Sequence, residues 1–213
     1  MGGPCLVKTA DSAWVRGPSC TDNFQLRKFT FDGAEYWSCE HAYQSHKFSP
    51  GPSRTGLSSI APHAGEKDSG HGMRVWSAGQ RFRDVRPDWD AAKVRVMLNV
   101  NRAKYAQHAD LRAGLAATGD AEFKGGPSTG WTFRGVNHNW SRWNGVIQTI
   151  IREEIRDSVE PDVAVDEATR ARRWAVLEQN LALIESTFSS PEVAAPPTAA
   201  DGAAAASAGC AEH

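Results

Sequence analysis

Apolar residues recur at intervals of three and four along much of the chain, a spacing that predicts amphipathic helices. One helix is expected from Asp88 to about Gln107, and the residues that share its apolar face are Val94, Met97, Leu98, Asn101 and Tyr105. Another is expected after Asn144, which can cap it, with a stripe formed by Val146, Ile147, Ile150, Ile151 and Ile155. Shorter helices are predicted over 73–78 and 110–117.

A last helix is predicted from about Asp166 to Ser186. Its apolar positions also alternate steps of three and four, and they are Trp174, Leu177, Leu181, Ile184 and Phe188. Such a seam must pack against the rest of the domain or against another chain. The preceding segment, 158–165, is interpreted as a linker, and the Pro- and Ala-rich residues 189–213 are expected to be disordered.

One β-hairpin is predicted within this helical pattern. Aromatic residues flank Asp32-Gly33 in the run 29–37, and Asp-Gly is typical of tight two-residue turns. Residues 1–20 are expected to be irregular, while 49–72 and 119–143 are rich in glycine and are expected to form loops.

The fold class expected from these elements is α+β, a compact and mostly helical domain with a small antiparallel β element. The domain is expected to occupy residues 21–158, after the irregular segment 1–20. A linker with the last helix, 159–188, and the tail, 189–213, follow it.

Composition fits an ordinary globular protein, with 40% hydrophobic and 23% charged residues. The net charge is -1, but residues 158–213 hold nine acidic residues against three arginines, so the rest of the chain is mildly basic. A mildly basic domain suits a ligand that bears phosphate. The excess of positive charge is too small to predict tight binding to duplex nucleic acid.

The cysteines indicate the compartment. Cys5, Cys20, Cys39 and Cys210 show no paired spacing of the kind that binds zinc, and no signal peptide precedes them. We therefore expect a reduced intracellular protein, cytoplasmic or nuclear. No apolar run is long enough for a membrane span, and the seven histidines show no ligand spacing, so no membrane partner, metal or other cofactor is expected. The oligomeric state stays open.

The candidate chemistry concentrates in residues 38–48, which are predicted to form a helix that begins at Ser38. Residues three and four apart share a helix face, and the stripe that this spacing defines consists of Glu40, Tyr43, Gln44 and Lys47. One interpretation is a solvated surface, the usual meaning of charges on a helix. The other is a site for chemistry at a sugar carbon, because a carboxylate, a phenol, an amide and an amine stand together.

Together with motifs elsewhere in the chain, this segment resembles the NADAR family, also called YbiA-like. The residues that carry the resemblance follow the family order over about 20–157, and they are Asp22-Asn23-Phe24, Gly33, Glu40-His41-Ala42-Tyr43-Gln44, Lys47-Phe48, Arg86-Pro87-Asp88-Trp89, Val96-Met97, Ala103-Lys104-Tyr105, 115–120, Trp143-Asn144-Gly145 and Ile151-Arg152-Glu153-Glu154. After Asp120 the sequence departs from the common bacterial pattern, and the stretch 122–131 looks more like eukaryotic members. The last helix and the tail lie outside the resemblance.

The resemblance implies an N-glycosidase-type hydrolase. Members of the family remove ADP-ribose from the amino group of guanine in nucleic acid, and others cleave riboflavin-pathway intermediates. The partner that it implies is therefore ADP-ribose, or ADP-ribosylated guanine in nucleic acid. Two alternatives stay open, a non-catalytic sensor of ADP-ribose or an NAD-derived nucleotide, and an N-glycosidase of small ribose-phosphate intermediates.

Glu40 and Lys47 are the residues expected to be catalytic. Cleavage of an N-glycosidic bond develops positive charge on the sugar, which a carboxylate stabilises or relieves by activating water. Glu40 suits this role as a base or charge stabiliser, since the dipole at the start of its helix would hold it ionised. Lys47 offers a second route, attack on an open-chain sugar aldehyde to form a Schiff base, with Glu40 as the proton shuttle.

Further positions are expected to bind substrate. The resemblance implies a pocket role for Asn23 and Phe24, and it allows one for Asn144. Tyr43 is a candidate to hold a ring or ribose hydroxyl.

Aromatic and glycine residues of the 119–143 segment are candidates for the far side of the pocket. Trp131, Trp140 and Trp143 are interpreted either as a wall on which a base stacks or as core packing. Gly130 and the neighbouring glycines would let the backbone approach a pyrophosphate. His41 and His46 are expected to be structural.

Overall fold

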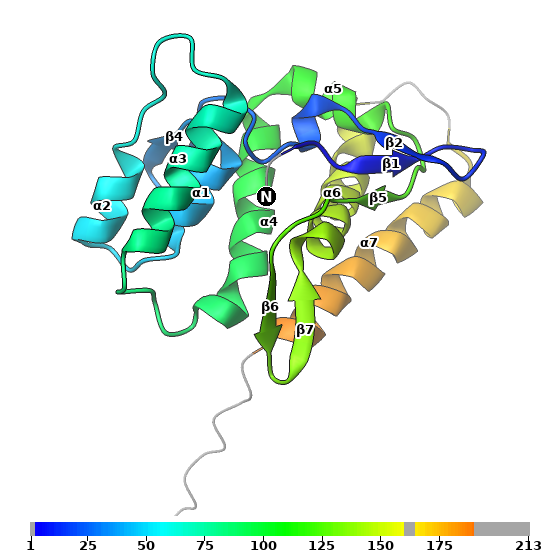
Figure 1. The fold of residues 1–213 in the computed structure, drawn as a ribbon. Coiled ribbons are helices and arrows are strands. Elements are labelled where there is room, and N and C mark those ends of the chain that lie inside the picture. Colours follow the sequence, from blue (N-terminus) through cyan, green and yellow to red (C-terminus); the bar gives the residue numbers. More distant parts are fainter. Residues whose placement is uncertain (1–2, 160–164, 190–213) are drawn as a thin grey trace, which may run out of the picture.

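Seven α-helices and seven short strands make up the described part of the chain, residues 3–159 and 165–189 of the computed structural model (Figure 1). The helices are α1 (Cys39–His46), α2 (Pro52–Ser58), α3 (Asp68–Arg81), α4 (Trp89–Gln107), α5 (Ala109–Ala116), α6 (Trp140–Val159) and α7 (Glu167–Phe188). The strands are β1 (Leu6–Lys8), β2 (Trp14–Arg16), β3 (Phe29–Phe31), β4 (Ala34–Tyr36), β5 (Phe123–Lys124), β6 (Gly130–Phe133) and β7 (Val136–Asn139). The expected α+β class is confirmed, while the predicted tail and most of the predicted linker lie outside the described residues.

Helix α4 lies at the centre, with α1, α2 and α3 on one side of it and α6 and α7 on the other (Figure 1). Its predicted apolar face is confirmed, because Val94, Met97, Leu98, Asn101 and Tyr105 are each at most 2% exposed. Burial of large apolar side chains stabilises the fold by about 1.5–3 kcal/mol each. This face therefore joins the two halves of the molecule around one core.

The β3–β4 hairpin matches the prediction and leads directly into α1. Asp32 and Gly33 have φ of 50° and 74°, the positive values that a type I′ turn requires. The Ser38 side chain accepts a hydrogen bond from His41 N at 3.2 Å and so caps α1 as predicted. Every residue of α1 is buried, which excludes the interpretation of its polar stripe as a solvated surface.

The prediction of an irregular segment over 1–20 is wrong for its described part. β1 pairs antiparallel with β2 and also with β5, which comes from the middle of the chain. Strands of two or three residues show too little alternation to be recognised in a sequence. Their pairing with a distant segment supplies the hydrogen bonds that hold them.

Both predicted loops contain regular structure. The segment 49–72 includes all of α2 and the start of α3, which is longer than the helix predicted over 73–78. Within 119–143, β6 and β7 form a second hairpin, turned by Arg134 and Gly135 with φ of 49° and 76°. Glycine here serves the tight turn of a hairpin rather than an open loop.

Helix α6 begins at Trp140, so Asn144 does not cap it. The Asn139 side chain instead accepts a hydrogen bond from Arg142 N at 2.9 Å, which is the geometry of an N-cap. Asn144 lies inside the helix with only 8% of its surface exposed. The predicted apolar stripe is confirmed at its centre, where Ile147 is fully buried.

Helix α7 packs along α6 and also contacts α4 (Figure 1). Leu177, Ile184 and Phe188 are buried as their spacing predicts, whereas Trp174 is 61% exposed and does not join the seam. The seam therefore docks on the domain itself. No helix in the described ranges is long and apolar enough to cross a membrane.

Candidate active site

Glu40 is the most deeply buried carboxyl group of the predicted site. Its backbone N–H donates to Asn23 O at 2.9 Å, which ties the start of α1 to the segment before the first hairpin. Its side chain has no exposed surface, and Oε1 accepts a hydrogen bond from Gln44 Nε2 at 2.8 Å. The second oxygen, Oε2, has no hydrogen-bond partner among the described residues. A buried carboxyl oxygen without a partner is costly and marks a position for a ligand or a proton.

Burial raises the pKa of Glu40 to about 7, and the hydrogen bond from Gln44 and the charge of Lys47 oppose this rise. Desolvation therefore opposes the ionisation of Glu40 that the helix dipole was expected to favour, because a carboxylate in the interior loses its water. A carboxyl group with a pKa near 7 can both give and accept a proton.

Gly79 on α3 admits two of the site's side chains. A Cβ at this position would lie 2.2 Å from Oε1 of Gln44, so only glycine allows the amide to stand where it does. The carbonyl oxygen of Gly79 accepts a hydrogen bond from Lys47 Nζ at 3.0 Å. α3 thus positions both the amide that holds Glu40 and the amine of Lys47.

Lys47 follows the last turn of α1 and is half-buried. Burial lowers its pKa, and so does the nearby positive charge of Lys93, while Glu40 and Asp90 oppose the shift. A lysine with a depressed pKa is the form that attacks carbonyl carbon.

Lys93 on α4 is a member of the cluster that the sequence did not point out. It is only 8% exposed, and its Nζ lies 2.5 Å from Asp90 Oδ1 and 4.6 Å from the ring centroid of Trp131. Lys93 lies off the apolar stripe of α4, so its spacing gave no sign of burial. Only the packing of α4 against α1 shows that the amines of Lys93 and Lys47 share one site.

An aromatic layer adjoins Glu40 and Lys47. Tyr43 is 4% exposed, and its ring centroid lies 4.9 Å from that of Trp89 and 5.3 Å from that of Trp140. Trp140 in turn lies 5.2 Å from Trp131, which is half-buried. Trp131 therefore keeps an accessible surface at the edge of this layer.

Trp143 does not belong to that layer. It is fully buried and packs edge-on against Phe188 of α7 at 5.0 Å. Its assignment as a base-stacking residue is therefore wrong, because a ring enclosed by the core has no face to offer. The indole lies one turn after Trp140 on α6.

Asn23 and Asn144, both predicted to bind substrate, face each other in the interior. Asn23 Nδ2 donates to Asn144 Oδ1 at 3.1 Å, and Asn23 Oδ1 accepts from Asn101 Nδ2 at 3.1 Å. Gln148 Nε2 extends the chain by donating to Asn101 Oδ1 at 3.2 Å. This buried amide chain joins α4 and α6 to Asn23, whose carbonyl oxygen accepts from Glu40 N at the start of α1.

The remaining predicted positions lie at its margins. Phe24 is 2% exposed and packs against α3, where a Cβ on Gly72 would come within 2.3 Å of its ring. Gly130 is exposed on β6, next to Trp131. Phe24 is therefore a support of the site's wall and makes no accessible surface.

The two histidines of α1 are structural, as expected. His41 Nδ1 accepts from Trp37 N at 3.2 Å, and its Nε2 donates to Leu57 O at 2.9 Å, which defines a neutral ring. Burial lowers its pKa to about 4. No group of three or more His, Cys, Asp or Glu side chains in 3–159 and 165–189 is arranged to hold a metal ion.

Comparison with known proteins identifies the family. Residues 10–124, more than half of the chain, match the NADAR domain, and the chain belongs to this family. An NMR structure of the E. coli protein YbiA matches with a TM-score of 0.51 and 23% sequence identity, over 70% of this chain and 84% of that chain. The fold is therefore that of YbiA.

Three relatives show the range of names in the family. N-glycosidase YbiA of Shigella flexneri serotype 5b (strain 8401) is 30% identical over 100 residues, which cover 47% of this chain and 58% of YbiA. N-glycosidase Npun_R5314 of Nostoc punctiforme is 28% identical over 140 residues, or 65% of this chain and 86% of that protein. Riboflavin biosynthesis protein VVA0006 of Vibrio vulnificus (strain YJ016) is 28% identical over 160 residues, or 73% of this chain and 41% of that protein.

The chain thus matches little more than half the length of YbiA. These relatives are bacterial, and they do not support the expected likeness to eukaryotic members.

Proposed function

We propose that this protein is an N-glycosidase that removes ADP-ribose from guanine bases of nucleic acid. The observation that carries the proposal is the cluster of Glu40 and Lys47, in which burial brings the pKa of the carboxyl to about 7 and lowers that of the amine. Titratable groups whose pKa values shift toward neutrality are typical of active sites. The names of the YbiA and Npun_R5314 relatives support glycosidase chemistry.

The Glu40 carboxyl acts on the glycosidic bond between C1′ of ribose and the guanine amino group. In one route the bond breaks with positive charge on the sugar, which the Glu40 carboxylate stabilises while it takes a proton from the attacking water, and that proton then passes to the departing guanine nitrogen. The free oxygen, Oε2, is the atom available for this contact. Gln44 holds the other oxygen and so sets the direction of the carboxyl plane.

Lys47 supplies the second route. Its neutral Nζ adds to C1′ of the ring-opened conjugate, the guanine amino group leaves with a proton from Glu40, and a Schiff base joins Lys47 to the sugar. Water then hydrolyses this imine, which releases ADP-ribose and restores the amine. Lys93 favours the neutral form of Lys47, because a second positive charge next to an ammonium destabilises it.

Trp131 is the candidate to stack on the guanine, since it is only half-buried and its ring lies at the edge of the aromatic layer. Tyr43, whose ring packs on Trp140 at 5.3 Å, is the candidate to contact the ribose. Asn23 and Asn144 act by supporting the start of α1 rather than by reading the base.

A second candidate is the same chemistry on a small ribose-phosphate conjugate. The name of the VVA0006 relative, a riboflavin biosynthesis protein, favours this substrate class. The same pair, Glu40 and Lys47, would break the bond, so the two candidates differ in the leaving group and not in the mechanism.

The test is a cleavage assay on an oligonucleotide that carries ADP-ribosylated guanine, read by mass spectrometry. Wild type should release ADP-ribose and restore intact guanine, and Glu40→Gln should not. Borohydride should trap a covalent adduct of wild type, and Lys47→Ala should form none. No release from any ADP-ribosylated strand would refute the guanine substrate, and activity on a ribose-phosphate conjugate would establish the second candidate. Binding of ADP-ribose without turnover of either substrate would make the protein a sensor.

A further inference from the structure

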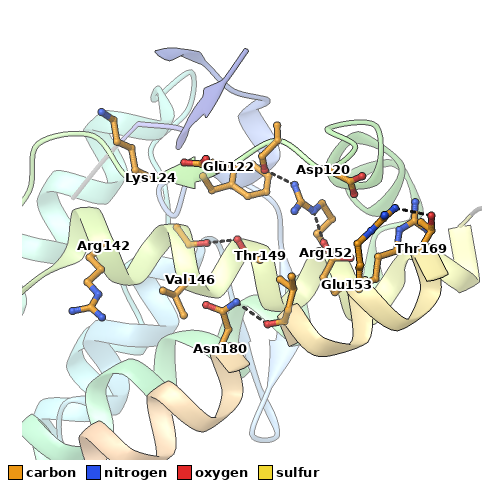
Figure 2. A pocket seen from close by; sticks show the side chains of 16 residues that line it. Asp120, Glu122, Lys124, Arg142, Val146, Thr149, Arg152, Glu153, Thr169 and Asn180 are labelled. Carbon is orange, nitrogen blue, oxygen red and sulfur yellow. Dashed lines mark hydrogen bonds and ion pairs between the residues drawn. The ribbon is translucent and has the colours of Figure 1, made fainter. Parts of the chain in front are cut away.

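A groove runs between α6, α7 and the segment 120–124 (Figure 2). It encloses a cavity of about 590 Å³, which is in the size range of ligand sites. None of its lining residues belongs to the catalytic cluster. One wall is α7, which lies beyond the residues that match the NADAR domain.

The three carboxylates that line the groove are already paired. Glu153 Oε1 lies 2.9 Å from Arg152 Nε, and its Oε2 lies 3.3 Å from Arg156 Nη1. Asp120 lies 2.6 Å from Arg156, and Glu122 lies 3.0 Å from Lys8. Their negative charge is therefore compensated.

Four positive side chains of the same groove form no direct ion pair among the described residues, although Asp120 acts on Arg173 and Asp166 acts on Arg172 at longer range. The four are Lys124, Arg142, Arg172 and Arg173, and within the described ranges no carboxylate forms an ion pair with any of them. Arg172 donates only to Thr169 Oγ1 at 2.8 Å, and Lys124 lies 4.1 Å from the ring centroid of Trp14.

Arg173 gives the most direct sign of a missing partner. Its Nε is buried, and no acceptor for it exists among the described residues. A buried donor without an acceptor is costly, and an anionic ligand in the groove would supply one. Guanidinium groups also match the geometry of phosphate, which they bind through two parallel hydrogen bonds.

We propose that this groove binds the sugar-phosphate backbone of single-stranded nucleic acid. The lining residues of α6 extend from Arg142 to Glu153, which corresponds to about 16 Å along the helix. The groove is therefore long enough for a short run of nucleotides of one strand. Arg142 marks one end, and Thr169, which accepts a hydrogen bond from Arg172, marks the other (Figure 2).

The Arg142 end of the groove adjoins the catalytic cluster. Two residues before it, Trp140 packs on Tyr43 at 5.3 Å and on Trp131 at 5.2 Å. A strand held in the groove would therefore leave it beside the site that takes the modified base. This link to the reaction rests on the proposed function, whereas binding of an unmodified strand does not.

The test measures the binding of the full chain to a fluorescent, unmodified, single-stranded 12-nucleotide DNA by anisotropy at low salt. The double variant Arg172→Gln/Arg173→Gln removes the positive charge at one end of the groove, and Arg142→Gln removes the positive charge at the other end. Arg170→Gln is the matched control, because Arg170 is exposed on the same helix and does not line the groove. Circular dichroism should show that all variants are folded.

We expect the double variant and Arg142→Gln to bind the strand about tenfold more weakly, while Arg170→Gln binds as wild type does. The slope of log K against log salt should fall by about 1.4 in the double variant, because two phosphate contacts are lost. Three results would overturn the proposal: no binding by wild type at low salt, equal losses in Arg170→Gln and the double variant, or equal affinity for an acidic peptide or ADP.

The two proposals can fail separately. If the groove proposal fails, ADP-ribosylated guanosine as a free nucleoside is still cleaved. The groove variants then cleave both this nucleoside and the modified strand at the wild-type rate. If the proposed function fails, the unmodified strand still binds and no substrate is cleaved. Cleavage of the nucleoside at the wild-type rate by the double variant, with slower cleavage of the strand, is the expected outcome.

Discussion

Gln44 holds Glu40 from one turn away on α1, with Nε2 donating to Oε1 at 2.8 Å, while the carbonyl oxygen of the same amide stands against Gly79 of α3. The orientation of the Glu40 carboxyl therefore depends on how closely α3 approaches α1. A helix packing distance, and not only the stripe on α1, decides whether the site is formed.

Gly79→Ala should abolish most activity and destabilise the protein by about 1–3 kcal/mol, because its Cβ would lie 2.2 Å from Gln44 Oε1. Glycosidase assays and urea denaturation measure the two effects. Gly114→Ala on α5 is the matched control. Its Cβ would meet Cys20 Sγ at an ordinary 3.6 Å, so the variant should keep activity and gain up to about 1 kcal/mol.

Combining Gly79→Ala with Gln44→Ala separates the clash from the loss of orientation. The double variant should recover stability relative to Gly79→Ala, since the second alanine leaves space for the first. It should stay inactive, because Glu40 has lost its hydrogen bond. Recovery of activity together with stability would show that Gln44 does not position the carboxyl.

Glu40 should make stability fall as pH rises. Its pKa is raised from 4.5 to about 7 in the folded state, so its contribution to stability is complete below pH 4.5 and is lost as pH rises to 7. The free energy of unfolding of wild type, relative to Glu40→Gln, should therefore drop by roughly 3 kcal/mol between pH 4.5 and pH 7.5. Urea denaturation of both proteins at the two pH values measures the difference, and a difference that does not change with pH would contradict the buried carboxyl.

Lys93→Met should move the ascending limb of the pH dependence of kcat/KM to higher pH. Burial and the charge of Lys93 both lower the pKa of Lys47, so without Lys93 more of Lys47 is protonated at neutral pH. Activity at pH 7 should fall, and part of it should return at higher pH. Lys93→Arg keeps the charge and should keep the profile, and an unchanged profile in Lys93→Met would exclude a neutral Lys47 as the reacting form.

Phe188→Ala should destabilise the protein by about 3–5 kcal/mol, since this 1% exposed ring anchors the end of α7 against Trp143. It also stacks near Trp131 at 6.4 Å, so turnover should drop at temperatures where the variant is folded. Thermal denaturation and the cleavage assay measure these effects. Trp174→Ala on the same helix, where the side chain is 61% exposed, should change stability by no more than about 0.5 kcal/mol.

Local features of the chain were predictable because they depend on neighbours in sequence. The Ser38 cap, the Asp32-Gly33 turn and the apolar face of α4 each arise from interactions within a few residues. The same holds for the stripe that contains Glu40 and Lys47, whose spacing alone places both on one face of α1. The catalytic interpretation of that stripe stays a prediction until the assays are made.

Tertiary packing decided the rest. The sequence suggests Asn144 as a helix cap, but in the structure it is a buried partner of Asn23. The sequence likewise suggests Trp143 as a stacking ring, but in the structure it packs against Phe188 of α7. The sequence by itself determined the helices, the hairpin and the polar stripe, since these follow from periodicity and turn chemistry. Only the tertiary structure decided that Glu40 is desolvated, that Lys93 joins Lys47 and that the arginines of α6 and α7 share a groove. Those properties belong to contacts between segments far apart in the chain, which no local pattern records.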